Sequence, residues 1–211
     1  MDFHFENELK AQGCRVVVGV DEAGRGPLAG PVVAAVCRLP EDFSMEGLND
    51  SKQLSEKERE GLFVAIRSAP GVDFGVGMAE VAEIDRINIL RASFLAMYRA
   101  LQQLKTPPEV ILIDGHLAPS FGIPTIPLVR GDARCASIAA ASILAKVTRD
   151  RRMVDLDKLY PQYGFREHKG YATREHLAAL ELFGPCAIHR KSFDPVKSFF
   201  KQDAEQLGLF E

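Results

Sequence analysis

Short apolar runs bounded by glycine, proline or acidic residues fill much of the chain before residue 130 and predict β-strands. Residues 15–21 and 32–39 are rich in valine and flank a segment of glycine and proline, so we expect two strands joined by a turn. Residues 73–80 alternate in polarity and predict a third strand, and residues 109–115 predict a buried fourth. Residues 123–129 predict a fifth strand, at a sheet edge because proline cannot donate to the ladder.

Other apolar positions recur at helical spacing. Ser55 followed by Glu58 resembles a capping box and predicts a helix that continues to about Arg67. The apolar positions between residues 84 and 101 predict one helix, which must end before Pro107. Two further helices are predicted over residues 136–159 and 173–183.

This order of elements predicts an α/β layered fold, in which helices flank a mixed central sheet and the C-terminal part is helical. A chain of 211 residues, 46% hydrophobic and 26% charged, suits one ordinary globular domain. We expect that domain over residues 15–200, preceded by an extension at 1–14 and followed by an acidic tail at 201–211.

Several classes of protein are disfavoured by the sequence. No segment approaches the roughly 18 apolar residues of a membrane span, and the start lacks the apolar core of a signal peptide. The four cysteines form no C-x-x-C pair, so we expect reduced thiols in a cytoplasmic protein and no zinc site. We also expect a monomer, although the sequence leaves the oligomeric state open.

The charge is unevenly distributed along the chain. The net charge is −3, but residues 146–201 carry 12 Lys and Arg against 7 Asp and Glu. Such an excess suits a surface that binds a polyanion such as nucleic acid, and it equally suits an ordinary solvated helical surface.

Acidic side chains stand at or just beyond the ends of three predicted strands. Asp21 and Glu22 end the first strand, Asp114 ends the fourth, and Asp132 follows the fifth. Strand ends of α/β sheets converge on one edge, so we expect these carboxylates to lie together. Their repulsion favours bound divalent cations, and oxygen-only ligands select Mg²⁺ or Mn²⁺. Many enzymes use two such ions to hydrolyse phosphodiester bonds.

Each acid also has an ordinary structural explanation. A single aspartate at a strand end is commonly a turn former, and Asp132 could cap the helix that follows it. Adjacent Asp21 and Glu22 project to opposite faces of a regular strand, so both bind metal only if the strand breaks there. The sequence AGRG after Glu22 is consistent with such a break.

Two further segments suit a polar ligand. Gly24 and Gly26 would allow the backbone to approach a ligand closely, and Arg25 could hold a phosphate or ribose-phosphate edge, although a tight turn explains the glycines equally well. Residues 163–176 interleave basic and aromatic side chains, as in segments that stack on bases or sugars, or as in a structured surface loop with a half-buried Tyr171.

Seven segments together resemble bacterial ribonuclease HII, in order and over roughly residues 15–198. They read GVDEAGRGPLAGPVVAAV, LNDSKQLSEKERE, EVAEIDRINILRASFLAM, ILIDG, ASIAAASILAKVTRDR, YGFREHKGYATREH and HRKSF. The resemblance implies a ribonuclease H-like fold and hydrolysis of the RNA strand of RNA–DNA hybrids with Mn²⁺ or Mg²⁺. It also implies cleavage 5′ to single ribonucleotides in duplex DNA, which leaves a 3′-hydroxyl and a 5′-phosphate and serves ribonucleotide and RNA-primer removal.

The resemblance also implies roles for individual residues. The family's four catalytic, metal-binding acids match Asp21, Glu22, Asp114 and Asp132, and Asp132 is preferred to Asp150 because it is nearer the sheet edge. The loop with which the family senses the ribose 2′-hydroxyl matches Gly24–Gly26, and the tyrosine that acts with this loop matches Tyr171. Candidate substrate-binding lysines complete the set: Lys52, Lys146 and Lys169. For Lys146, phosphate contact and helix packing are both open.

The last residues resemble the short Gln-Leu-x-Leu-Phe peptide with which bacterial replication proteins bind the sliding clamp. The matching positions are Gln206, Leu207, Leu209 and Phe210. Apolar residues in an acidic tail suit a peptide that docks in a partner's pocket, or one that folds back on its own domain.

Two other functions remain to be weighed against the ribonuclease. A junction resolvase would share the fold, but the Gly-Arg-Gly loop and Tyr171 disfavour it. An adaptor that binds hybrids without cutting them would have no reason to keep carboxylates near phosphates.

Overall fold

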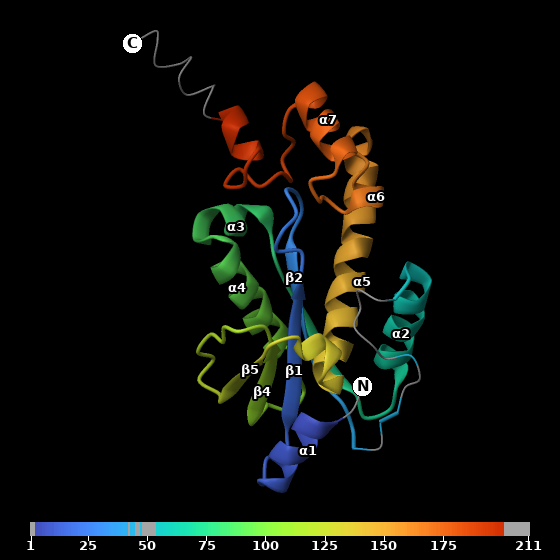
Figure 1. Ribbon diagram of the computed structural model, residues 1–211, viewed down its shortest axis with the longest axis vertical. Coiled ribbons are helices and arrows are strands. Elements are labelled where there is room, and N and C mark those ends of the chain that lie inside the picture. Colours follow the sequence, from blue (N-terminus) through green and yellow to red (C-terminus); the bar gives the residue numbers. More distant parts are fainter. Residues whose placement is uncertain (1–2, 42, 45–46, 48–53, 201–211) are drawn as a thin grey trace. The chain divides into compact units, whose positions relative to one another are not determined.

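The computed structural model describes residues 3–41, 43–44, 47 and 54–200 (Figure 1). The chain divides into two compact units. The first comprises Met1–Ala23, Val33–Met78 and Ser93–Thr148, and the second comprises Gly24–Val32, Ala79–Ala92 and Arg149–Glu211.

A five-stranded sheet in the order β3-β2-β1-β4-β5 forms the framework of the first unit. Its strands are β1 (Val17–Ala23), β2 (Val32–Arg38), β3 (Asp73–Ala79), β4 (Val110–Asp114) and β5 (Thr125–Leu128). β1 pairs antiparallel with β2 and parallel with β4, which pairs parallel with β5. The predicted mixed sheet and the edge position of the proline-containing strand are therefore confirmed.

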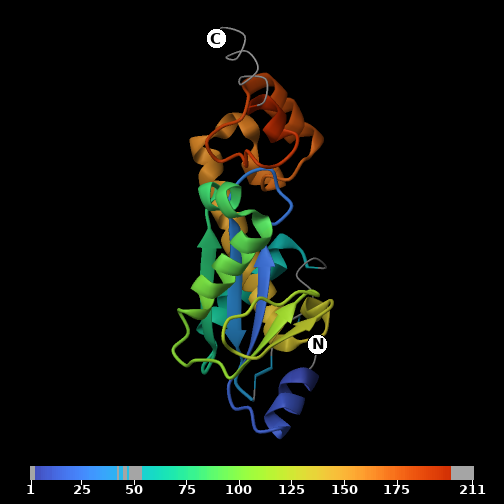
Figure 2. The ribbon, with the colours of Figure 1, turned by 90° about the vertical axis from the view of Figure 1, so that its left-hand side faces the viewer.

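Helices pack closely on this sheet (Figures 1 and 2). A Cβ atom at Gly19 of β1 would lie 2.2 Å from the backbone of Ser137 in α5 (Ala136–Leu159), so α5 touches the strand itself. Gly77 of β3 meets α4 (Ile89–Leu101) in the same way, 2.0 Å from the carbonyl oxygen of Ala96. The glycines allow this close approach because any side chain would collide with helix backbone.

Several local predictions hold. Ser55 caps α2 (Glu56–Ser68) in a complete capping box with Glu58. α5 begins and ends where the apolar pattern predicts, and α7 (Arg174–Phe183) begins one residue later, after its cap Thr173. Short helices η2 (Pro161–Tyr163) and α6 (Phe165–His168) precede α7, so the C-terminal part is helical as expected.

Two local predictions were wrong or incomplete. The single helix predicted over residues 84–101 is two helices, α3 (Val81–Ile87) and α4, separated at Asn88. Asn88 has a φ of 68°, and its side chain accepts a hydrogen bond from the amide of Arg91, which caps α4. The extension at 1–14 contains an unpredicted helix, α1 (His4–Ala11), whose Phe5 and Leu9 pack on the sheet unit's core.

Each unit has its own apolar core. In the first, four alanines and three larger aliphatic residues of α5 pack with β2 and α2 around Phe63 and Ile66. In the second, Phe165 lies among Ala29, Met153, Leu156 and Tyr163. None of the helices in the described ranges is long and apolar enough to cross a membrane.

Candidate functional site

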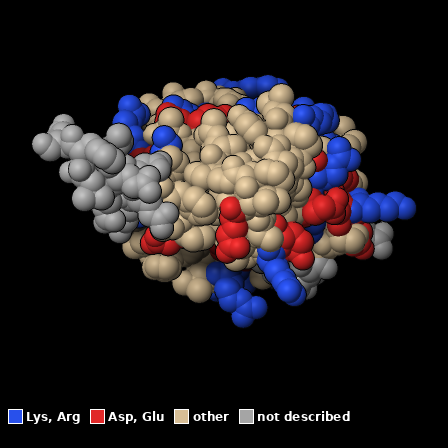
Figure 3. Space-filling view, turned by 90° about the horizontal axis from the view of Figure 1, so that it is seen from above, with Lys and Arg blue, Asp and Glu red and all other residues tan. Residues whose placement is uncertain are grey.

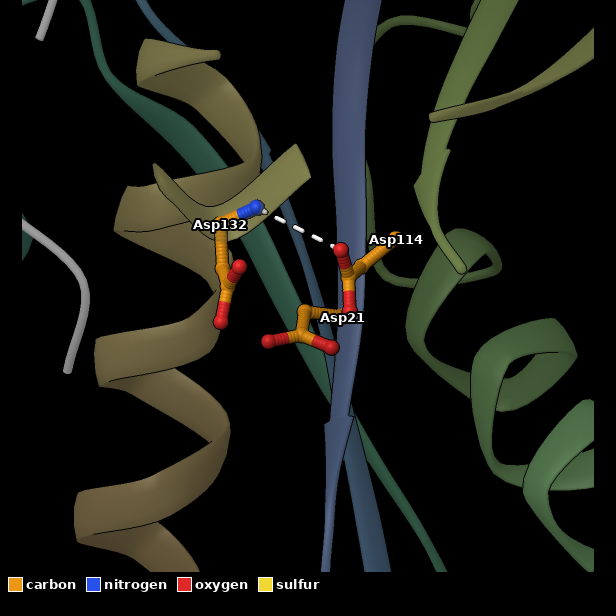
Figure 4. Close-up of side chains that lie close together, drawn as sticks. All are labelled: Asp21, Asp114 and Asp132. Carbon is orange, nitrogen blue, oxygen red and sulfur yellow. Dashed lines mark hydrogen bonds between the residues drawn. The ribbon is translucent and has the colours of Figure 1, made fainter. Parts of the chain in front are cut away.

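Three aspartates of the first unit converge at one point (Figure 4). Asp21 lies in β1, Asp114 ends β4, and Asp132 lies in the short helix η1 (Gly131–Ala133) that precedes α5. One carboxylate oxygen from each lies within 4.8 Å of the others. The structure thus brings together three of the four acids that the sequence singled out.

The backbone explains why these side chains meet. β1 and β4 are parallel neighbours with Val20 opposite Ile113, which places Asp21 beside Asp114 at the same end of both strands. Asp114 Oδ1 accepts hydrogen bonds from the amide of Gly131 at 2.7 Å and of Asp132 at 3.4 Å. One carboxylate oxygen therefore holds the η1 turn that carries the third acid.

The cluster concentrates negative charge in a poorly solvated place. Asp21 and Asp132 are 7% and 3% exposed. Burial raises the pKa of Asp21 well above its usual value, and the charges of Glu22 and Asp114 raise it further. A divalent cation would relieve this repulsion, and three carboxylates are the oxygen ligands that Mg²⁺ and Mn²⁺ prefer. The residues present therefore fit a metal ion of that class.

Glu22 is placed differently from the three aspartates. The pairing of β1 with β2 continues regularly through Glu22 and Ala23. The strand therefore lacks the break that would let Asp21 and Glu22 bind the same metal site. Asp21 and Glu22 consequently project to opposite faces of the sheet. Of the described acids, only Asp21, Asp114 and Asp132 form the cluster, while Glu22 acts on it through the charge that it places near Asp21.

The Gly-Arg-Gly loop and Tyr171 lie together in the second unit. Gly24 has a φ of 96°, and a Cβ atom there would lie 2.0 Å from Nε of Arg149, so only glycine fits. Arg25 and Gly26 are exposed. A Cβ atom at Gly26 would lie 3.9 Å from the ring of Tyr171, which is 45% exposed. The loop and the aromatic ring thus form one exposed surface.

Of the three candidate lysines, the structure describes Lys146 and Lys169. Lys52 lies outside the described residues. Lys146 is half-buried on α5. Lys169 ends α6 with a φ of 52°, and its ammonium group donates to the carbonyl of Arg166.

The basic excess of residues 146–201 does not gather on the face seen in Figure 3. Among the described residues of that face, tan side chains fill the centre, and blue and red ones are interspersed towards the edges. Two of the arginines counted in the excess, Arg149 and Arg190, are 1% and 0% exposed. Part of the basic charge is therefore internal.

Two buried histidines beside Tyr171, His176 and His189, were not anticipated from the sequence. Nδ1 of His176 lies 2.8 Å from the Tyr171 carbonyl, which can only accept, so Nδ1 carries the proton. Nε2 of His176 lies 3.0 Å from Nε2 of His189, whose Nδ1 accepts from the amide of Cys186 at 2.9 Å. One set of tautomers satisfies every contact, with both rings neutral and His189 donating to His176.

This pair predicts a pH-dependent stability. Burial lowers the pKa of His189 from 6.5 to about 4, with the charge of His176 as the second cause, and burial also lowers the pKa of His176. The groups facing them are His168, stacked on His176, with Tyr163 and Cys186 against His189. Because the folded protein favours the neutral rings, their contribution is complete above pH 6.5 and is lost as the pH falls towards 4.

Urea unfolding of the wild type and of His189→Gln at pH 7.5 and at pH 4.5 measures this effect. The wild type should lose more unfolding free energy between the two pH values, by on the order of 3 kcal/mol. The raised pKa of Asp21 acts in the opposite direction but is common to both proteins, so it cancels in the difference. An equal loss in both proteins would contradict the assignment of neutral rings.

Comparison with known proteins covers almost the whole chain. The family model described as ribonuclease HII matches residues 18–196. A ribonuclease HII of Desulfitobacterium hafniense is 56% identical over 192 residues, which are 91% of this chain and 74% of that protein. A ribonuclease HII of Chlamydia trachomatis is 51% identical over 198 residues, or 94% of this chain and 91% of the relative.

Solved structures agree in fold. Ribonuclease H2 of Pyrococcus horikoshii superposes with a TM-score of 0.72 and 29% identity, covering 89% of this chain and 98% of the other. Ribonuclease HII of Archaeoglobus fulgidus, solved in complex with PCNA, superposes with a TM-score of 0.68, covering 85% and 96%, and at 24% identity it shows the fold alone. The resemblance seen in the sequence is confirmed, and the chain belongs to the ribonuclease HII family.

Proposed function

We propose that the cluster of Asp21, Asp114 and Asp132 is the metal centre with which this endoribonuclease hydrolyses the RNA strand of RNA–DNA hybrids. The observation that carries the proposal is the approach of three carboxylate oxygens to within 4.8 Å of one another in a largely buried place. Without a bound cation, three carboxylates this close together in a buried place would repel one another and destabilise the fold. Metal binding therefore explains the arrangement better than a purely structural role does.

Two Mg²⁺ or Mn²⁺ ions bound at such a centre would activate the attacking water and stabilise the leaving 3′-oxygen. The chain's own part is to hold the ligands in place. Asp21 and Asp114 are fixed by paired strands, and Asp132 is fixed by the amides that Asp114 binds. Glu22 adds negative charge beside Asp21, and we include it as the fourth acid of the set.

The same cluster predicts that divalent ions stabilise the protein. At an ion concentration about 100 times the dissociation constant, binding to the folded state alone adds about 2.7 kcal/mol. Thermal unfolding with Mn²⁺ or Mg²⁺ and with chelator should show this increase in the wild type. Asp132→Asn should lose most of it, whereas Asp155→Asn, at an exposed aspartate paired with Lys158, should keep it. An undiminished shift in Asp132→Asn would remove Asp132 from the ligand set.

We further propose that the exposed surface of Arg25, Gly26 and Tyr171 recognises the ribose at a single ribonucleotide in duplex DNA. The 2′-hydroxyl alone distinguishes ribose from deoxyribose, and backbone amides can bind it only where side chains leave room. An aromatic ring beside them can stack on the sugar or base. Lys146 and Lys169 are assigned to phosphates. This surface supports a ribonuclease over a junction resolvase, which has no 2′-hydroxyl to detect.

The chain's C-terminal peptide, outside the described residues, is proposed to bind the bacterial sliding clamp. Removal of residues 206–211 should abolish binding to the clamp in a pull-down or calorimetric titration, because Leu207, Leu209 and Phe210 supply the apolar contacts. Cleavage of a free oligonucleotide duplex should be unchanged. Equal clamp affinity with and without these residues would refute the proposal.

We place the enzyme in the cytoplasm, in keeping with its four free cysteines.

A further inference from the structure

The segment His189–Arg190, from the motif HRKSF, belongs to the second unit, and the cleavage reaction itself does not explain its role. Both side chains are buried, at 1% and 0% exposure. The segment is extended beside residues 28–30: the amide of Arg190 donates to Leu28 O, and the amide of Gly30 donates to Ile188 O. Consecutive side chains of an extended segment point in opposite directions.

Arg190 holds the backbone of the Gly-Arg-Gly loop. Its guanidinium donates to the carbonyl of Gly24 at 2.6 Å, of Arg25 at 2.9 Å and of Gly30 at 3.0 Å. In a trans peptide the C=O of one residue and the N–H of the next point in opposite directions. Because the carbonyls of Gly24 and Arg25 face the guanidinium, the N–H groups of Arg25 and Gly26 point away from it. Arg190 thus fixes the direction of the N–H groups of Arg25 and Gly26.

His189 acts on the other recognition element. It donates through Nε2 to His176, which in turn donates to the carbonyl of Tyr171. The amide of Leu28 also donates to the carbonyl of Gly170, next to Tyr171. One dipeptide is therefore connected by hydrogen bonds to both the loop and the tyrosine.

The segment is itself firmly anchored. Asp85 of α3 accepts hydrogen bonds from the amides of Lys191 at 3.1 Å and Ser192 at 3.0 Å, and from the Ser192 hydroxyl at 2.6 Å. Burial and the charge of Arg149 lower the pKa of Arg190 to about 9. Holding a guanidinium there is costly, and an apolar residue would often stabilise a core better. This cost favours a role in geometry over a role in stability.

We propose that Arg190 and His189 are positioning residues that preset the Gly24–Gly26 loop and Tyr171, so that preference for ribose over deoxyribose depends on both without either touching the substrate. The inference rests on the proposed recognition role of that surface. It assigns the motif HRKSF to substrate selection, not to cleavage.

Binding measurements in the cleavage-deficient Asp114→Asn background test it. Fluorescence anisotropy with Mg²⁺ gives the affinity for a DNA duplex containing one ribonucleotide and for the same duplex with deoxyribose throughout. Adding Arg190→Gln should lower the ratio of the two affinities by about tenfold, the effect of about one misplaced hydrogen bond. Arg190→Lys should be equally defective, since one ammonium cannot bind three separated carbonyls. Arg152→Gln, at a half-exposed arginine near Glu80, should leave the ratio unchanged.

His189 provides an independent pair of variants. His189→Phe keeps a ring but removes the donor, and should lower the ratio; His189→Gln keeps an N–H donor and should restore most of it. If Arg190→Gln does not fold, as judged by circular dichroism, the His189 pair decides the question. An unchanged ratio, or equal loss of affinity for both duplexes, would overturn the inference. If Asp114→Asn alone shows no ribose preference, the proposed recognition surface fails instead.

Discussion

Asp114→Asn should lower the single-turnover rate on a duplex with one ribonucleotide by at least about 10³-fold, or about 4 kcal/mol of transition-state stabilisation. The substitution removes the charge of one of the three carboxylates whose oxygens lie within 4.8 Å of one another. Asparagine keeps an Oδ1 atom able to accept the amides of Gly131 and Asp132, so the η1 turn should persist. The loss would therefore report on the metal centre and not on unfolding.

The matched control for that variant is Asp155→Asn, which removes the same charge from an exposed residue paired with Lys158 at 2.7 Å. It should cleave at the wild-type rate. Far-ultraviolet circular dichroism should be the same for both variants. A near wild-type rate for Asp114→Asn in Mg²⁺ would show that the cluster is not the catalytic centre.

Tyr171→Ala should lower the rate on single-ribonucleotide duplexes by about 5- to 150-fold, because one aromatic stacking contact contributes about 1–3 kcal/mol. The ring is 45% exposed, so its removal should leave stability nearly unchanged. Hybrids with continuous RNA should be affected less, because they offer many positions at which a ribose can be engaged.

Tyr171→Phe separates the ring from its hydroxyl. If stacking dominates, this variant should retain most of the activity; if the hydroxyl binds the substrate, it should fall with Tyr171→Ala. Unchanged single-turnover rates for Tyr171→Ala on the single-ribonucleotide duplex would remove Tyr171 from the recognition surface.

The aspartate cluster could be anticipated because its positions follow from simple rules. Asp21 and Asp114 end apolar runs, and parallel pairing of those strands brings their ends together. Glu22 could not be placed in the same way, because the strand's end is set by its pairing with β2, which continues to Ala23. The break at Asn88 was missed because the helical spacing of apolar residues continues across it.

The buried arginines were the least predictable feature. A pattern of polar positions assigns arginine to the surface, whereas Arg149 and Arg190 are internal and bind carbonyls more than 100 residues away in the chain. Their partners are backbone carbonyls, which every residue type carries, so the sequence does not indicate which residues accept these hydrogen bonds. Only the three-dimensional structure connects HRKSF with the Gly-Arg-Gly loop.

Cleavage of a labelled DNA duplex that contains one ribonucleotide tests the central claim most directly. With Mg²⁺ or Mn²⁺, the wild type should cut 5′ to the ribonucleotide and leave a 3′-hydroxyl and a 5′-phosphate. Chelator, the Asp114→Asn substitution or replacement of the ribonucleotide by deoxyribonucleotide should each abolish the product. Undiminished cleavage under any one of these three conditions would contradict the account.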